Sequence, residues 1–435
     1  MKTCLRFGPL ILPVLALAAP NLSLDAALKE ALENNRAYRV SDIDARTAAG
    51  QVSWGRAGAL PKADISVSQI RSINDTRQER VGSAPEEKQG AKSTVTAAGI
   101  TGTWTLFEGL TSLATHDRLI SQAAWAEGRR LQVQQDIAAQ VIMAYVDVVR
   151  QQTVLAAIDS AVSLSRERVK ITEGKYGLGS ISKLELLQAK LDLNEDLSSR
   201  LKQGTTLANA RLTLNRVLAR TDSTGFSVDD SIPLPEVPTY SELRSMAMDR
   251  NPELRQAAQG RSLASAGYRE YRGQLFPQLG VNLGYNYGLS ESQAGFIKSN
   301  EALGWNYGVN LKWNIFDGFV LPNDYRSARA AERRADLLYD DAKARLETAL
   351  SEAEENHRAS REVLALEESN LGLAKENMGI AMERLRLGTI ASLELRAAQQ
   401  KYVAAETRLV TARFECKRAE TELLGLAGSL VTASP

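Results

Sequence analysis

The chain has 435 residues, of which 44% are hydrophobic, 24% charged and 6% aromatic, and its 53 basic and 52 acidic residues leave a net charge of +1. Balanced charge argues against a nucleic-acid-binding protein, which carries a basic surplus, and the apolar content is too high for intrinsic disorder. A mean hydropathy of −0.25 is too polar for a bundle of transmembrane helices. Composition alone therefore suggests a soluble, mostly helical protein.

The N-terminal segment is predicted to be a secretory signal peptide. Two basic residues precede an apolar run from Leu10 to Leu17, and Ala16-Leu17-Ala18 fits a small-x-small cleavage site. We place the signal at residues 1–18. Cys416 is then the one cysteine of the mature chain, so we expect no intramolecular disulfide.

The first half is predicted to contain a helix, two strands and two long helices, in that order. The opening helix ends where Pro61 interrupts the hydrogen-bond ladder. The predicted elements are a helix at 23–60, strands at 63–73 and 94–107, and helices at 112–176 and 183–219.

The second half repeats this order, with helices and strands of similar length. Its predicted elements are a helix at 240–274, strands at 278–289 and 303–316, and helices at 322–387 and 392–426. A helix of about 65 residues is about 100 Å long, which is far beyond the usual helix of a globular domain. Such helices must lie along other helices, as in a coiled coil or a tube.

The two halves carry the same motifs in the same order. Trp104 to Gly109 (WTLFEG) matches Trp313 to Gly318 (WNIFDG), and the glycine-containing turn YGLGS matches LRLGT. The offset between matched residues is 216 early in each half and 209 late. This order indicates an internal duplication. We assign residues 19–220 to a first structural repeat, 221–238 to a proline-containing linker, 239–428 to a second repeat and 429–435 to a C-terminal tail.

The predicted strands have the alternation of membrane strands. In residues 303–315 every odd position is apolar and every even position is Gly, Asn or Lys, and residues 278–289 alternate likewise. Period two places these sets on opposite faces. A soluble antiparallel sheet also alternates, but aromatic residues near strand ends with Gly and Asn opposite are typical of an outer-membrane barrel. The predicted membrane-facing aromatic residues are Trp104, Tyr285, Tyr287, Trp305, Tyr307 and Trp313.

Four strands per chain cannot close a barrel, and open strand edges cannot face lipid because their backbone N–H and C=O groups would be unpaired. The chain is therefore expected to oligomerise. Two copies would give eight strands, whose side chains fill the interior, whereas three copies give twelve strands with space for water. The fold class predicted is mostly α, internally duplicated, with coiled-coil helices forming an α-barrel and four transmembrane β-strands per chain closed as a twelve-stranded barrel in a trimer.

With these motifs the chain resembles the TolC-like outer-membrane efflux protein family over nearly its whole mature length. The resemblance rests on the duplicated order of the LSLDAAL segment that begins at Leu22, the Trp-x-x-Phe-acid-Gly strand exits and the two helical turns. It implies a homotrimer in the outer-membrane lipid whose helices extend as a tunnel into the periplasm. It also implies a periplasmic adaptor protein and an inner-membrane pump as partners, in an efflux pump or a type I secretion system.

The resemblance also implies two kinds of site near the periplasmic tip. The short turns of the family contact the adaptor, which points to Leu178, Gly179, Ser180, Leu387, Gly388 and Thr389. Glu185 and Glu394 match positions near the tunnel constriction, where a ring of acids would favour cations. Where relatives can carry a second acid the chain has Ala397, with Arg396 beside it, which weakens the expectation of strong cation selectivity.

No catalytic or cofactor motif is found, and we expect neither enzymatic activity nor a cofactor. The chain has no phosphate-binding loop and no nucleophile elbow. His116 and His357 lie far apart without neighbouring ligands at metal spacing, so we expect no metal site; His357 is expected on a solvated helix face. The alternative function is a secreted periplasmic helical scaffold or binding protein, with no membrane-inserted part.

Overall fold

The computed structural model describes residues 21–79, 81–82, 84–220, 226–229 and 231–430. The predicted signal peptide therefore lies outside the described residues, as do parts of the predicted linker and tail. The chain divides into two compact units, one comprising residues 1–39, 133–251 and 346–435 and the other residues 40–132 and 252–345. The second of these units contains the four-stranded sheet.

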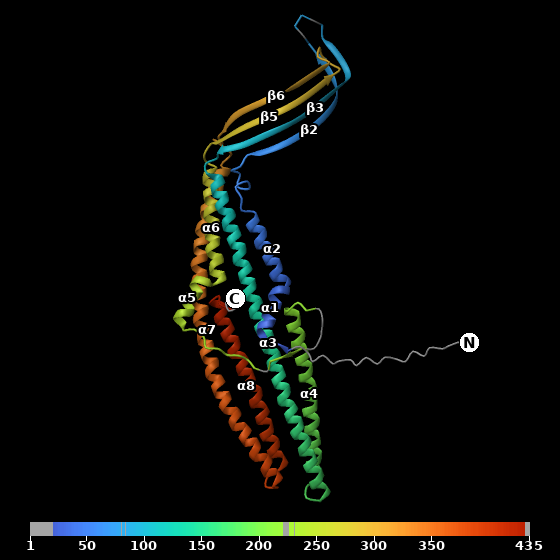
Figure 1. The fold of residues 1–435 in the computed structure, drawn as a ribbon, viewed down its shortest axis with the longest axis vertical. Helices are drawn as coiled ribbons and strands as arrows, with labels where there is room; N and C mark the ends of the chain where they lie inside the picture. Colours follow the sequence, from blue (N-terminus) through green and yellow to red (C-terminus); the bar gives the residue numbers. More distant parts are fainter. Residues whose placement is uncertain (1–20, 80, 83, 221–225, 230, 431–435) are drawn as a thin grey trace, which may run out of the picture. The chain divides into compact units, whose positions relative to one another are not determined.

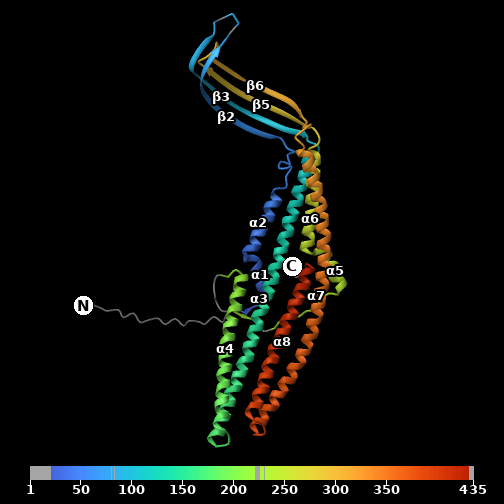
Figure 2. The same ribbon diagram turned by 180° about the vertical axis from the view of Figure 1, so that it is seen from behind.

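The sheet is antiparallel throughout, in the order β2-β3-β5-β6, and helices follow it in the same unit (Figure 1). Strands β2 and β6 are its two edges. In this unit α2, α3, α6 and α7 lie side by side in that order in both views (Figures 1 and 2). The elements are α2 (Arg36–Gly50), β2 (Lys62–Gln78), β3 (Glu86–Phe107), α3 (Thr111–Gly177), α6 (Pro252–Gly273), β5 (Gln278–Ser292), β6 (Ser299–Lys312) and α7 (Val320–Arg386).

The other unit contains the far parts of α3 and α7 together with the helices that return from them. Four long helices lie side by side in the order α4, α3, α8, α7 (Figures 1 and 2). Helices α3 and α7 each have 67 residues, and α4 and α8 each have 35. The further elements are β1 (Asn21–Leu22), α1 (Leu24–Asn34), α4 (Lys183–Val217), β4 (Ser227–Val228), α5 (Tyr240–Arg250) and α8 (Ser392–Leu426).

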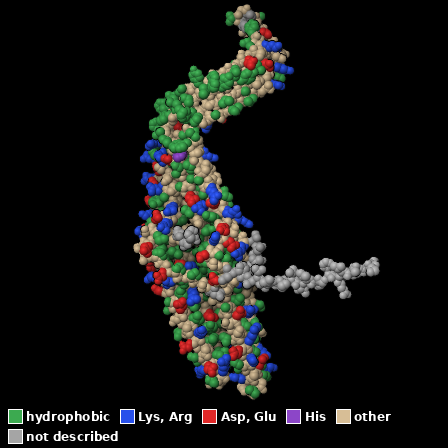
Figure 3. All heavy atoms as spheres, in the orientation of Figure 1, with side chains coloured by type: hydrophobic (Ala, Val, Ile, Leu, Met, Phe, Trp, Pro, Cys, Tyr) green, Lys and Arg blue, Asp and Glu red, His purple; other side chains and the backbone are tan. Residues whose placement is uncertain are grey.

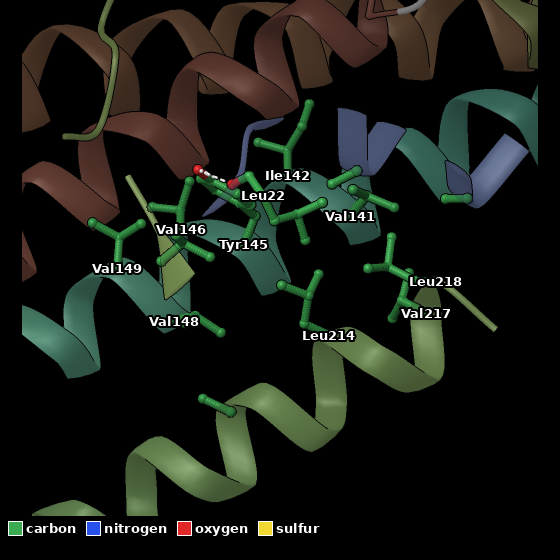
Figure 4. Close-up of a cluster of buried hydrophobic side chains, with 14 of the residues drawn as sticks. Leu22, Val141, Ile142, Tyr145, Val146, Val148, Val149, Leu214, Val217 and Leu218 are labelled. Carbon is green, nitrogen blue, oxygen red and sulfur yellow. Dashed lines mark hydrogen bonds between the residues drawn. The ribbon is translucent and has the colours of Figure 1, made fainter. Parts of the chain in front are cut away.

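The main core of this unit forms where α3 packs against α1 and α4 (Figure 4). Val141, Tyr145 and Val149 of α3 are at most 2% exposed, and Leu214 of α4 is fully buried. The Tyr145 hydroxyl donates to the Leu22 carbonyl at 2.9 Å, which joins β1 to this core. By length and composition, an 18-residue window in α3 is apolar enough to span a membrane, and 39% of it is buried.

Each predicted opening helix is split into two helices by an asparagine. The first is α1 and α2, which meet at Asn35, and the second is α5 and α6, which meet at Asn251. Asn35 donates to the Val217 carbonyl at 3.2 Å and Asn251 donates to the Leu426 carbonyl at 3.0 Å. The prediction of two continuous helices was therefore wrong, because each asparagine leaves the helix to bind the end of a long helix.

The strands of the first hairpin are longer than predicted. β2 pairs with β3 from Lys62 opposite Thr103 to Gln78 opposite Glu86, with a bulge at Asn74–Thr76. The added residues at the start of β3, 86–93, are mostly polar on both faces and lack the alternation of apolar and polar residues, so the sequence gives no periodic signal for their pairing. The long helices agree with prediction within about two residues, and the order of elements in the two halves is the same.

Candidate functional site

The sheet has one apolar face shared by all four strands. Ile65 lies opposite Ile100, which lies opposite Tyr285, which lies opposite Trp305. Facing residues on paired strands point to the same side, so this row continues across the whole sheet. Trp305 is 68% exposed although it is apolar. The other predicted aromatic residues of the strands, Trp104, Tyr287 and Tyr307, occupy rows of the same face, and Trp313 directly follows β6.

The opposite face is polar and consists mainly of Gly, Asn and Thr. The Asn286 amide donates to Asn306 Oδ1 at 2.5 Å. A Cβ atom at Gly284 would lie 2.5 Å from the same oxygen, so the asparagine can lie across the neighbouring strand only because the facing residue is glycine. This face is polar and largely uncharged, as expected for the water-filled side of a barrel wall.

The repeated Trp-x-x-Phe-acid-Gly motif has the same contact in both halves. The Trp104 indole donates to the Ala59 carbonyl at 3.0 Å, and the Trp313 indole donates to the Leu275 carbonyl at 3.3 Å. In each half the motif's glycine and the residue after it have positive φ, at 66° for both Gly109 and Leu110. The motif therefore fastens the strand exit to the preceding loop and turns the chain into the long helix.

The two predicted docking turns share one backbone geometry. Gly179 and Gly388 have φ of +73° and +76°, and both turns have the hydrogen bonds of a Schellman motif. Ser180 N donates to the Lys175 carbonyl and Thr389 N to the Arg384 carbonyl, each at 2.9 Å. The leucine before each glycine is exposed, Leu178 by 83% and Leu387 by 69%. Each turn therefore presents an apolar side chain on a fixed backbone.

A buried ionic cluster joins the α3–α4 hairpin to α8. Arg168, only 1% exposed, pairs with Asp192, and Arg396 pairs with Asp196 at 2.8 Å. Gln399 donates to the Ala161 carbonyl and to Ser165 Oγ, both at 2.9 Å. Sequence reasoning missed this cluster. Its one sequence signal is that Arg168 and Asp192 are equally far from Ser180, so an antiparallel hairpin brings them together.

Nearer the turns the two hairpins are also in contact. The Lys175 ammonium donates to the Leu385 carbonyl at 3.2 Å, and Arg386 pairs with Glu167 at 2.9 Å. Arg386 and Glu167 are about half exposed, and such surface pairs contribute little stability. The buried cluster is therefore the main polar link between the hairpins.

The predicted constriction residues Glu185 and Glu394 are both exposed in the first turn of α4 and α8. Glu185 N donates to Ser182 Oγ at 3.3 Å, which caps α4. Arg396, by contrast, is buried among Asp192, Glu195 and Asp196. Arg396, which in the sequence weakened the expectation of strong cation selectivity, thus has its charge taken up by acids of α4.

Within the described residues, no group of three or more His, Cys, Asp or Glu side chains is arranged to hold a metal ion. His116 stacks on Trp54 with ring centroids 3.9 Å apart. His357 is half-buried rather than on the solvated face that was expected, and this burial, together with the nearby Arg361, lowers its pKa. Cys416 is free and fully buried.

Comparison with known proteins identifies the arrangement. The outer membrane efflux protein family model matches residues 27–220 and 243–429. Protein CyaE of Bordetella pertussis is 26% identical over 94% of this chain and 85% of its own length. The CmeC outer membrane channel of Campylobacter jejuni superposes with a TM-score of 0.80 at 16% identity, over 95% of this chain and 87% of that one. The MtrE outer membrane channel of Neisseria gonorrhoeae, in its open state, gives 0.77 at 15% identity, over 95% and 90%.

Proposed function

Because the chain belongs to the outer membrane efflux protein family, we propose that it is the exit duct of a tripartite efflux pump or a type I secretion system. Members of this family are outer-membrane transport channels, and this chain extends from the outer membrane into the periplasm. The predicted family is thus confirmed, as is the mostly helical, TolC-like fold with a small antiparallel sheet, whereas the trimer and its closed barrel are part of the proposal. Transport through the duct is passive, and the inner-membrane pump supplies the energy.

The observation that carries this proposal is a sheet with one exposed apolar face and two open edges. β2 and β6 each have one side without a strand partner among the described residues. In lipid such edges must be paired. Three copies joined β6 to β2 give a closed barrel of twelve strands, with the aromatic rows facing lipid and the Asn–Gly face lining water.

The long helices have matching seams at their two edges. On α7, at one edge, Leu366, Leu373 and Ile380 are exposed at a spacing of seven residues, and Leu387, directly after the helix, continues the spacing. On α4, at the other edge, Leu184, Leu191 and Leu212 are exposed on the same seven-residue register. This spacing is typical of a coiled-coil seam. It supports packing of α7 of one copy against α4 of the next, which closes the helices into a tube.

We further propose that the chain is two copies of one structural repeat, residues 19–220 and 239–428 around the linker 221–238. The paired Asn and Trp contacts support this, since Asn35 and Asn251 differ by 216 positions and Trp104 and Trp313 by 209. A trimer of duplicated chains then has six similar hairpin tips. The two turns, Leu178-Gly179-Ser180 and Leu387-Gly388-Thr389, are the proposed docking sites for a periplasmic adaptor.

Gating is proposed at this tip, where adaptor contacts favour the open arrangement of the hairpins. Glu185 and Glu394 of three chains would form rings of carboxylates at the constriction, and such rings favour cations. Glu394→Gln is expected to lower the cation-to-anion permeability ratio, measured from reversal potentials in planar bilayers. Glu376→Gln, on the exposed side of α7, is the matched control and should leave the ratio unchanged.

The assembly is tested by its mass and solubility. Protein extracted from outer membranes is expected to require detergent and to have the light-scattering mass of three chains. Leu373→Glu should shift it toward monomer by placing a charge in the helical seam, whereas Lys375→Glu, an exposed site two residues away, should not. A water-soluble monomer without detergent would instead support the helical scaffold, and the channel proposal would be abandoned.

A further inference from the structure

An apolar groove lies where the central strands of the sheet meet their helices. It has a volume of about 580 Å³ and is lined by Phe107, Leu110, Leu113 and Phe276, with Arg269 and Arg272. All four apolar side chains are between 41% and 61% exposed. Figure 3 shows hydrophobic side chains gathered at this junction, continuous with those along the sheet, and basic side chains directly beyond them. The groove thus joins an apolar surface to a basic one.

The groove opens on the apolar side of the sheet. Phe107 lies opposite Leu279, which lies opposite Leu311, and this row belongs to the same face as the Tyr285–Trp305 row. A second hollow at the junction is lined instead by Gln278, Lys312 and Asn314, among others. Gln278 and Lys312 pair on the polar face. Phe276 lines both hollows, so they adjoin at the junction, but the strand residues of the apolar groove belong to the face proposed to meet lipid.

A neighbouring copy does not need to cover this groove. It lies at the end of β3, at the start of α3 and at the end of α6, which leads into β5. β3 and β5 are the two central strands, and copies join through the edge strands β2 and β6. The groove is therefore left open to the leaflet on the periplasmic side.

The positive charge beside the groove is only partly neutralised by the chain, through Asp117, which also lines the groove. Arg269 pairs with Asp117 at 2.9 Å, but Arg272 and Arg329 have no acidic partner within 4 Å among the residues that the structure describes. Arg272 lies one helical turn after Tyr268 on α6, and Arg329 one turn after Tyr325 on α7; the two tyrosine hydroxyl groups are 2.7 Å apart. The hydrogen bond to Tyr325 raises the pKa of Tyr268, and the charges of Arg329 and Arg272 oppose this.

Two guanidinium groups beside two phenols provide the donors that bind a phosphate well, since arginine binds phosphate oxygens with paired, charge-assisted hydrogen bonds. We propose that Arg272 and Arg329 bind the phosphate of an anionic glycerophospholipid of the periplasmic leaflet, with an acyl chain lying along Phe107, Leu113 and Phe276. A lipid is favoured because the apolar groove lies next to the arginines. A free phosphate would leave the groove empty, whereas a phospholipid can place its phosphodiester at the arginines and an acyl chain in the groove.

The test is lipid binding to the purified, delipidated full-length protein, measured by native mass spectrometry with phosphatidylglycerol and phosphatidylcholine as probes. Wild type is expected to retain phosphatidylglycerol in preference to phosphatidylcholine. Arg272→Gln with Arg329→Gln should weaken phosphatidylglycerol binding at least about tenfold, the loss expected for one charge-assisted hydrogen bond. Leu113→Gln should weaken it several-fold, because the acyl contact is lost.

The matched control is Arg261→Gln with Arg345→Gln, which removes one arginine from each of the same two helices. These residues lie about 16 Å and 24 Å along α6 and α7 from Arg272 and Arg329, and both are ion-paired within the chain. The control should bind phosphatidylglycerol as wild type does. The proposal is overturned if the Arg272/Arg329 variant binds as tightly as the control, if phosphatidylcholine binds equally well, or if soluble glycerol phosphate competes as effectively as the lipid.

Discussion

Replacing Arg396 with glutamine is expected to loosen the attachment of α8 to the α3–α4 hairpin. Arg396 is the counter-ion of Asp196, which is only 13% exposed. Without it, Asp196 keeps its hydrogen bonds from Ser165 Oγ at 2.5 Å and Gln399 at 3.5 Å but has no cation, while Asp192 still has Arg168. Breaking a buried pair costs about 3–5 kcal/mol.

The expected loss is about 3 kcal/mol, at the lower end of that range, because Asp196 retains two hydrogen bonds and some contact with water. This corresponds to an opening equilibrium of the hairpin contact about 100-fold more favourable. Native-state hydrogen exchange of the detergent-solubilised protein reports it directly. Peptides covering 161–168 and 192–199 should exchange about 100-fold faster in Arg396→Gln, since exchange follows the local opening free energy.

Two further variants separate this explanation from general disruption. Arg413→Gln removes an arginine of the same helix whose pair with Glu368, at 3.3 Å, is about half exposed, so exchange should change by less than a few-fold. Adding Asp196→Asn to Arg396→Gln removes the orphaned charge and should recover most of the protection. If the double variant exchanges as fast as Arg396→Gln alone, the buried-charge reasoning is refuted.

Three other outcomes follow from single positions. Gly388→Ala should destabilise the tip turn by about 1–2 kcal/mol, because φ is +76° there. The control Gly372→Ala, within α7 and in open space, should be neutral or stabilising. Equal rates of hydrogen exchange at the turn in the two variants would contradict this. The lowered pKa of His357 means that its stabilising contribution is present above its ordinary pKa of 6.5 and is lost as pH falls, so His357→Gln should reduce the drop in unfolding temperature between pH 7.5 and 5.5. In single-tryptophan variants, brominated lipid should quench Trp305 strongly and Trp125 hardly at all; equal quenching would remove Trp305 from the lipid face.

The sheet was largely predictable because its signal is local. Alternation at 278–289 and 303–315 needs only neighbouring residues. The structure places 278–289 in β5 and 303–312 in β6 with their apolar residues on one face, whereas 313–315 follow the end of β6. The same reasoning fails at the end of β3. A bulge between Thr105 and Phe107 puts Phe107 rather than Leu106 opposite Leu279. The alternation of apolar and polar residues cannot predict where such a bulge occurs.

The helix breaks show a second limit of local signals. Pro252 could have indicated a boundary, but nothing around Asn35 interrupts the helical pattern. Asn35 ends α1 because its amide donates to the Val217 carbonyl and its Oδ1 accepts from Ala37 N at 2.9 Å. The partner is 182 residues away. Only the internal duplication, which relates Asn35 to Asn251, could have suggested that both asparagines have the same role.

The buried cluster changes how the charge at the tip should be understood. In the sequence Arg396 adjoins Ala397, where relatives can carry a second acid, and its charge weakened the expectation of strong cation selectivity. On a helix, however, residues two apart face different sides: Glu394 is exposed, whereas Arg396 is buried against Asp196. The arginine therefore holds the hairpins together and does not pair with the exposed Glu185 or Glu394. Because Arg396 is buried in these ion pairs, its presence no longer argues against the proposed preference of the tip for cations.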